Sequence, residues 1–295
     1  MGIRENPKTL VYQCLNCLVQ FIEPSYKDVE KYYRETYRNE HDCVIGKKLT
    51  PEERYKLVRP SMNEPAYRFQ KFVPKGSSVL EVGCSSGYFL EALQRYGYDV
   101  YGAELNPEDA AYVRDVGGIP CEEGNLDDIY PGRKFTAVAA LAVLEHQPDP
   151  IEFLRQIKRK LIGGGYLYLE LPSNQDALLT IYDCPEYRDR YYRECHITYW
   201  QVETMAKVLG VLGFEASVTT RQRYGLLNHI NWMLNHEPTE SYFIATDHLT
   251  MVKPSHPMFA TVTRMTNKLD REYRLSLETI KAGDTIVATC RLRYI

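Results

Sequence analysis

The chain has 295 residues, a hydrophobic share of 44% and a formal net charge of −3. This length allows one large domain with additions, and the apolar share is ample for a core. The slight negative charge predicts no nucleic-acid partner, because nucleic-acid binding needs a basic surface. No apolar run is long enough to span a membrane, so we expect a cytoplasmic protein with reduced cysteines and no membrane partner.

Residues 11–24 contain Cys14 and Cys17 ahead of a short apolar strand. A Cys-x-x-Cys turn followed by a strand is half of a zinc ribbon. His41 and Cys43 offer two further ligands, but their His-x-Cys spacing is unlike a ribbon. We therefore predict that the pair holds no zinc and that the chain has no metal site.

Two helices are expected before the central part of the chain, over 26–40 and 51–72. Thr50 is a capping residue followed by a proline, which is typical of a helix start. Pro60 and Pro65 are expected to break the second helix into pieces.

Strands and helices then alternate. Strands are predicted at 78–83, 99–104, 119–122, 135–141, 166–171, 215–223 and 284–293. Helices are predicted at 87–96, from 106, at 150–161 up to the stop at Gly163-Gly164-Gly165, at 201–212 and at 258–280. Such alternation predicts an α/β fold with a doubly wound, parallel sheet covered by helices on both faces.

The strand at 78–83 runs into a turn between Gly83 and Gly87. Gly83 allows a sharp backbone turn, and Gly87 allows close approach to the following helix start. The N–H groups of that start favour an anionic or electron-rich ligand. Glu81 is a carboxylate on an otherwise apolar strand, where a ligand ammonium is a natural partner.

Three known turns compete for this pattern. The middle glycine of the dinucleotide fingerprint is missing, and so is the lysine of a P-loop. The residues from Gly83 to Gly87 also match the nucleophile elbow of α/β-hydrolases around Ser85. That elbow follows several strands of its sheet, whereas the residues before Ser85 do not read as a series of strands.

The turn instead closely resembles the first motif of class I S-adenosylmethionine (SAM) methyltransferases. Three more segments match the family in order: the acid Glu104, the loop at Asn125, and the Glu-His pair that ends in His146. The resemblance covers roughly 78–223. It implies a Rossmann-like seven-stranded sheet in which the last strand pairs beside the sixth.

The resemblance also implies three segments. Residues 1–75 would form the Cys-x-x-Cys element and a helical lid, 76–223 the SAM-binding core, and 224–295 a substrate-side insertion and the final strand. SAM is the implied cofactor, and Glu104 would accept the ribose hydroxyls. The implied cofactor-binding residues are Glu81, Gly83, Cys84, Ser85, Gly87, Phe89, Glu104, Leu105, Asn125, Leu126, Ala140 and Leu141.

Two histidines are candidates for the base that takes the acceptor's proton. His196 lies in the loop after the fifth strand, and an ordinary histidine pKa of about 6.5 suits proton removal at neutral pH. We favour it over His146, which Glu145 can brace structurally. The implied acceptor-binding residues are Arg190, Tyr192, Arg193 and Tyr199, of which the arginines suit a phosphate or carboxylate.

The expected reaction is transfer of a methyl group from SAM to a hydroxyl of a small metabolite. The nearer likeness is to bacterial enzymes that methylate small molecules and sugars, so a sugar or phosphate-bearing precursor of a polysaccharide or natural product is the favoured acceptor. N- or C-methylation and a catalytically silent SAM-binding partner remain alternatives. The prediction leaves room for a homodimer.

Overall fold

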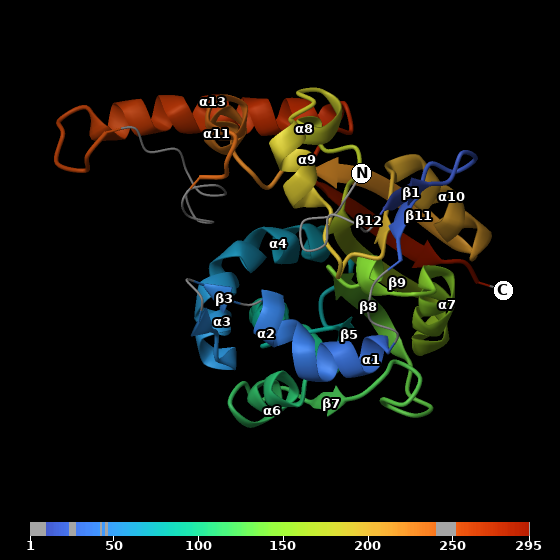
Figure 1. Cartoon of the computed structure of the whole chain (residues 1–295). Helices are drawn as coiled ribbons and strands as arrows, with labels where there is room; N and C mark the ends of the chain where they lie inside the picture. The colour runs from blue at the N-terminus through green and yellow to red at the C-terminus, as the bar shows by residue number, and fades with distance from the viewer. Residues whose placement is uncertain (1–9, 24–27, 42, 45–46, 240–251, 295) are drawn as a thin grey trace. The chain divides into compact units, whose positions relative to one another are not determined.

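Figure 1 shows the computed structural model of the chain. The structure describes residues 10–23, 28–41, 43–44, 47–239 and 252–294, and the side chains of His41 and Cys43 lie outside what it describes. The chain divides into two compact units. Unit 1 comprises Met1–Pro24, Leu171–Ala206 and Val218–Val287, and unit 2 comprises Ser25–Glu170, Lys207–Ser217 and Ala288–Ile295.

The predicted seven-stranded sheet is confirmed, with the strand order β11-β12-β9-β8-β5-β6-β7. Its strands are β5 (Ser78–Val82), β6 (Asp99–Glu104), β7 (Cys121–Glu123), β8 (Phe135–Leu141), β9 (Leu161–Pro172), β11 (Phe214–Arg221) and β12 (Thr285–Leu292). The pairs β5–β6, β5–β8, β6–β7 and β8–β9 are parallel. Their carboxyl ends therefore share one edge of the sheet, which is where open α/β sheets bind ligands.

The helices of unit 2 follow its strands as the sequence predicts. They are α5 (Tyr88–Arg95), α6 (Pro107–Asp115) and α7 (Pro150–Lys160), preceded by α3 (Pro51–Val58), the 3₁₀ turn η2 (Arg59–Met62) and α4 (Asn63–Phe72). Thr50 caps α3 with a complete capping box to Glu53. The break falls at η2, whereas Pro65 lies in the first turn of α4, where a missing N–H costs no helical hydrogen bond.

The start of unit 2 is a helical segment with an irregular middle. It consists of α1 (Val29–Lys31), the π-helical turn η1 (Tyr32–Thr36) and α2 (Tyr37–His41), followed by the short strands β3 (Cys43–Val44) and β4 (Lys47–Lys48). The N–H of Tyr37 donates to the carbonyl of Tyr32, five residues earlier. A π-turn of this kind commonly marks a functional position.

Unit 1 contains a separate three-stranded sheet in the order β1-β2-β10. β1 (Val11–Gln13) and β2 (Gln20–Ile22) form the hairpin that carries Cys14 and Cys17, and β10 (Thr198–Tyr199) pairs with β2. The carbonyl of Cys17 accepts a hydrogen bond of 2.6 Å from the Thr204 hydroxyl. The absence of zinc at this pair stays a prediction.

The remaining helices are α8 (Ala177–Thr180), α9 (Pro185–Tyr191), α10 (Val202–Val211), α11 (Leu226–Asn235) and α13 (Phe259–Thr279). Figure 1 shows α11 beside the long α13. Asp270 of α13 accepts a bond of 2.7 Å from the backbone N–H of Leu226, which begins α11.

One feature differs from the prediction. Strand β9 begins at Leu161 and includes the three glycines that we expected to lie between helix and strand, because α7 already ends at Lys160. The two compact units interleave along the chain, and the division into segments 1–75, 76–223 and 224–295 stays a prediction. Strands β9, β11 and β12 each contain residues of both units, so the chain passes between the units more than once.

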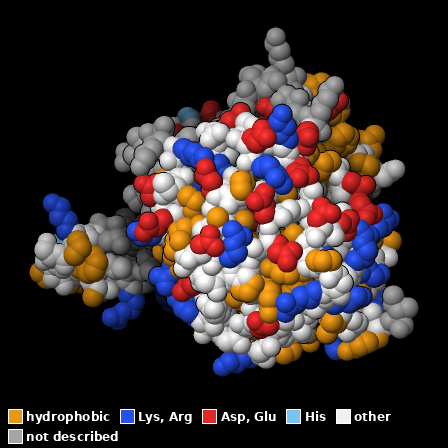
Figure 2. Space-filling view, turned by 90° about the horizontal axis from the view of Figure 1, so that it is seen from below, with side chains coloured by type: hydrophobic (Ala, Val, Ile, Leu, Met, Phe, Trp, Pro, Cys, Tyr) orange, Lys and Arg blue, Asp and Glu red, His pale blue; other side chains and the backbone are white. Residues whose placement is uncertain are grey.

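The face drawn in Figure 2 carries acidic and basic side chains interspersed with apolar ones. Within the described ranges, no helix combines the length and apolar character needed to cross a membrane.

We expect the core of unit 2 to depend on Phe69. Its ring is fully buried and meets those of Phe89, Tyr98 and Tyr168 at centroid distances of 5.9, 5.3 and 5.6 Å. Phe69→Ala should lower the free energy of unfolding by about 3–5 kcal/mol, because it removes these contacts and leaves a cavity.

Chemical denaturation would measure this loss. Tyr67→Ala is the matched control, since Tyr67 lies on the same helix and is 51% exposed. Equal losses in the two variants would contradict the assignment of Phe69 to the core.

Candidate functional site

The turn after β5 is fixed by its backbone. Gly83 has a φ of +69°, and a Cβ atom there would lie 2.6 Å from a methyl carbon of Val143. The N–H groups of Gly83 and Cys84 both donate to the carbonyl of Ala103, at 2.8 and 3.1 Å. Gly87, with a φ of +77°, then caps α5. The turn is therefore joined directly to the end of the neighbouring strand β6.

Glu104 closes β6 and accepts two backbone hydrogen bonds. The N–H of Ser85 donates to one oxygen at 2.7 Å and that of Asn106 to the other at 2.9 Å. Burial raises the pKa of this carboxyl, while the positive charge of Arg38 and the two N–H groups lower it. A carboxylate oxygen has more than one lone pair, so Glu104 can still accept ligand hydroxyls.

Glu81 on β5 is a buried carboxylate with an open oxygen. Its exposed fraction is 2%, and its Oε2 has no hydrogen-bond partner among the described residues. Burial, followed by the nearby charge of Glu104, raises the pKa of Glu81 well above its usual range. A buried carboxylate needs a positively charged partner when it is ionised. The residues therefore fit a ligand that brings both a positive charge and hydroxyl groups, as SAM does.

Comparison with known proteins decides the family. Residues 56–217, more than half of the chain, match the family described as methyltransferase domain. The chain belongs to this family and is a SAM-dependent methyltransferase. The dinucleotide, P-loop and hydrolase interpretations of the glycine turn are thereby excluded.

Several individual proteins resemble this methyltransferase. A ubiquinone biosynthesis O-methyltransferase of Proteus mirabilis is 24% identical over 188 residues, covering 56% of this chain and 76% of that protein. One from Xanthomonas oryzae pv. oryzae is 33% identical over 113 residues, which is 36% of this chain and 47% of that protein. The crystal structure of a SAM-dependent methyltransferase from Archaeoglobus fulgidus superposes with a TM-score of 0.53 and 17% identity, covering 81% and 97% of the two chains, and so shares the fold.

The helical segment 28–41 of the methyltransferase reaches the glycine turn through Arg38. Its guanidinium donates to the hydroxyl of Ser85 at 2.9 Å and pairs with Asp109 at 2.9 Å. Asp109 is fully buried and also pairs with Arg54 at 2.5 Å and accepts from the Ser86 hydroxyl at 2.8 Å. Two arginines from the N-terminal helices thus meet one acid beside the turn.

The same segment touches the loop at Asn125, which we expected to bind the cofactor. The side-chain amide of Asn125 donates to Glu30 at 2.5 Å, and Arg34 pairs with Glu123 at 3.0 Å. The carbonyl of Arg34 also accepts from the side chain of Asn106 at 3.3 Å. The helical segment is therefore tied to the loops after β5, β6 and β7, and its role as a lid stays a prediction.

His146 contacts the same helical segment. It is 6% exposed, and its Nδ1 is 2.5 Å from the hydroxyl of Tyr33. Its Nε2 is 3.8 Å from a carboxylate oxygen of Glu145, and the ring of Tyr37 packs edge-on against it at 5.9 Å. These contacts supply the structural role that we considered for His146.

The remaining predicted cofactor residues differ in how much of them a ligand can reach. Leu105 and Leu141 are half-buried, and Ala140 and Leu126 are buried at the strand ends. Cys84 and Phe89 are fully enclosed: the Cys84 sulfur lies 3.7 Å from that of Cys121, and Phe89 stacks on Tyr168. Their side chains serve the core, because contacts within the protein already cover them.

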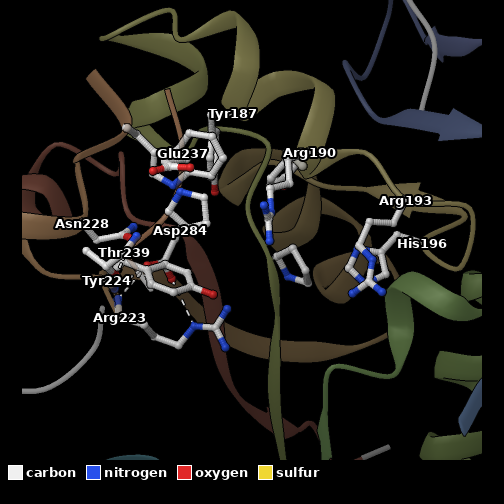
Figure 3. A pocket seen from close by; sticks show the side chains of 14 residues that line it. Tyr187, Arg190, Arg193, His196, Arg223, Tyr224, Asn228, Glu237, Thr239 and Asp284 are labelled. Atoms are coloured by element: carbon white, nitrogen blue, oxygen red, sulfur yellow. Dashed lines mark hydrogen bonds and ion pairs between the residues drawn. The ribbon is translucent and has the colours of Figure 1, made fainter. Parts of the chain in front are cut away.

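The predicted acceptor residues belong to unit 1. Arg190, Arg193 and His196 line a single pocket of about 800 Å³ (Figure 3). Tyr192 and Tyr199 lie in a hydrophobic cluster instead, with exposed fractions of 5% and 0%. The Tyr192 hydroxyl donates to Gln20, and that of Tyr199 accepts from the N–H of Arg193. These two tyrosines shape the loop, and their contact with the acceptor stays a prediction.

Arg38, Arg54 and Asp109, the partners of the glycine turn, are not among the predicted site residues. One signal was available: Arg34 and Arg38 are four residues apart on a predicted helix and therefore share a face. The lining of the pocket in unit 1 also includes residues that we did not predict, among them Arg223, Tyr224, Asn228 and Trp232.

Glu81→Gln should weaken SAM binding by about 2 kcal/mol, or about 30-fold, because a charge-assisted hydrogen bond is lost. The unliganded variant should be at least as stable as the wild type at neutral pH, since the wild type must either ionise Glu81 in a buried position beside Glu104 or take up a proton there on folding. Titration calorimetry and thermal unfolding measure the two effects, and Glu91→Gln on α5 is the control for removing one acid.

The affinity for SAM should change with pH in a direction that follows from the charge of Glu81. A cationic ligand pairs with ionised Glu81, so below the raised pKa of the free protein a proton must leave before SAM binds. SAM affinity should therefore fall as the pH is lowered, and Glu81→Gln should flatten this dependence. A variant with wild-type affinity, or one that is less stable without ligand, would contradict this role for Glu81.

Arg38→Gln should weaken SAM binding about tenfold while leaving the unfolding temperature nearly unchanged. The helical segment loses its tie to Ser85, but Asp109 keeps Arg54 and Ser86 as partners. Arg54→Gln is the contrasting variant: its side chain is 4% exposed, and its loss should cost about 3 kcal/mol of unfolding free energy. Unchanged SAM affinity in Arg38→Gln would show that this tie does not serve the cofactor.

Proposed function

We propose that this methyltransferase transfers a methyl group from SAM to a hydroxyl of a small metabolite, plausibly a sugar or a phosphate-bearing precursor in polysaccharide or natural-product biosynthesis. The observation that carries the proposal is that His196 shares one pocket with Arg190 and Arg193. The O-methyltransferase names of the relatives support oxygen as the accepting atom.

Bound SAM supplies an already activated methyl group. The protein's own contributions are alignment, exclusion of water and removal of one proton from the acceptor. Glu81 and Glu104 hold and orient the cofactor. The imidazole of His196 takes the hydroxyl proton, and its ring packs on Tyr199 at 5.9 Å, which fixes its position in the loop.

Arginine side chains suit the anionic part of such an acceptor, because their planar donors match phosphate and carboxylate. The loop that presents them is held firmly. The N–H of His196 donates to the carbonyl of Arg193 at 3.1 Å, and the N–H of Arg193 donates to the Tyr199 hydroxyl at 2.8 Å. Arg193 and His196 are therefore fixed relative to each other by a short turn.

Turnover of SAM to S-adenosylhomocysteine would test the proposal directly. A panel of phosphorylated and carboxylated metabolites with free hydroxyls should contain an acceptor, and mass spectrometry of the product should place the methyl on oxygen. Methylated nitrogen or carbon would refute the hydroxyl. SAM binding without turnover by any acceptor in the panel would favour the silent partner protein.

His196→Gln should lower kcat by about 10²–10⁴-fold, the range of a lost general base, and leave SAM affinity unchanged. His146→Gln is the matched variant, which should instead lower stability through loss of its contact with Tyr33. Both are measured by turnover at saturating SAM and by thermal unfolding. Near wild-type turnover in His196→Gln together with loss of activity in His146→Gln would reverse the assignment.

A further inference from the structure

The pocket in unit 1 is large for a simple metabolite. Its volume of about 800 Å³ lies toward the upper end of the roughly 300–1,000 Å³ found for small-molecule sites. Its walls come from α9, from the loop that carries His196, from the residues after β11, and from α11 with the residues that follow it. An occupant that fills it must be longer than one sugar ring.

One end of this pocket is cationic. In Figure 3 Arg193 and His196 lie together at one end, and Arg190 lies between them and the rest of the lining. The two acids in the lining, Glu237 and Asp284, lie at the other end. This separation of charge orients an anionic ligand, because its phosphates are drawn toward Arg190 and Arg193 and repelled from Glu237.

The other end combines flat faces with hydrogen-bonding groups. Tyr187 and Trp232 meet edge-to-face at 5.2 Å, and Tyr224 also lies at this end of the pocket. Only 3% of the surface of Asn228 is exposed. Its Oδ1 accepts hydrogen bonds from the N–H and the hydroxyl of Thr239 at 3.3 and 3.2 Å. These bonds fix the amide and leave its NH₂ donors to address a ligand.

Arg223 adds little net charge to this second end. Its Nε pairs with Asp284 at 3.3 Å, and its backbone N–H donates to the same acid at 2.7 Å. The second end thus keeps the negative charge of Glu237 and is aromatic and rich in donors and acceptors. These are the features that recognise a nucleobase, which offers both a flat face and polar edges.

We propose that the acceptor is a sugar carried by a nucleoside diphosphate. The sugar lies at His196, the diphosphate at Arg193 and Arg190, and the base at the end formed by Tyr187, Tyr224 and Asn228. The inference rests on the proposed function only in placing the methylated hydroxyl at His196. A sugar phosphate alone would leave the aromatic end of the pocket empty.

Titration calorimetry with nucleoside diphosphates, in the absence of SAM, tests the ligand class. At least one of UDP, GDP, ADP, CDP and dTDP should bind one-to-one and at least tenfold more tightly than pyrophosphate or glucose 1-phosphate. Failure of all five to bind the folded protein overturns the inference. Binding of pyrophosphate as tight as that of the best nucleotide also overturns it, because the base would then contribute nothing.

Three variants locate the site. Arg190→Gln should weaken nucleotide binding at least tenfold, and Asn228→Ala should reduce the preference for one base over the others. Arg188→Gln is the matched control: it removes an arginine from the same helix that pairs with Asp183 and does not line the pocket. Equal weakening by Arg188→Gln and Arg190→Gln, with both variants folded, would overturn the placement.

The two proposals fail in different ways. If a nucleoside diphosphate binds as expected but its sugar conjugates are not methylated, the ligand class stands and the proposed methyl transfer falls. If a phosphorylated metabolite without a nucleoside is methylated while no nucleotide binds, the function stands and the ligand class is refuted.

Discussion

Two buried carboxylates at the ends of adjacent strands constrain this protein more than any other interaction. Glu81 and Glu104 lie on β5 and β6, and each raises the cost of ionising the other. Glu104 is compensated by two backbone N–H groups and by the charge of Arg38, whereas Oε2 of Glu81 has no partner among the described residues. The unliganded protein therefore retains an electrostatic cost that a cationic ligand removes.

The backbone conformation of the glycine turn supports the same pair of carboxylates. The N–H of Ser85 can reach Glu104 only because the chain turns sharply at Gly83 and because Ser85 itself adopts a φ of +48°, which is unfavourable for a residue with a side chain. Arg38 donates to the Ser85 hydroxyl and so helps to hold this conformation from a distant helix. Strain in the turn, burial of the acids and closure by the helical segment are thus parts of one arrangement.

Most strands and helices of the sheet could be predicted from the sequence, because each carries its own local pattern. Glu81, Glu104, Asn125 and His196 could be singled out for the same reason: each follows or ends a recognisable strand or loop. The placement of the last strand beside the sixth followed only from the family resemblance, since a local pattern does not say which strands pair. Arg38 could not be joined to Ser85, since 47 positions separate them and only tertiary folding brings them together. The burial of Phe89, Tyr192 and Tyr199 could not be predicted, because an aromatic residue next to a site motif looks the same in the sequence whether its ring faces a ligand or the core.

A buried acid in each unit shows how hydrogen bonds within the protein distinguish a structural acid from one that is available to a ligand. Asp284, immediately before β12, is as buried as Glu81, with 3% of its surface exposed. Its oxygens accept from the N–H groups of Arg223 and Tyr224, from the Gln222 amide and from the Thr285 hydroxyl. This acid fixes the segment that presents Arg223 and Tyr224 to the pocket and retains little capacity for a ligand. Glu81 is buried to the same extent, and its Oε2 has no such donor among the described residues, which is why we expect Glu81 and not Asp284 to bind a cationic ligand.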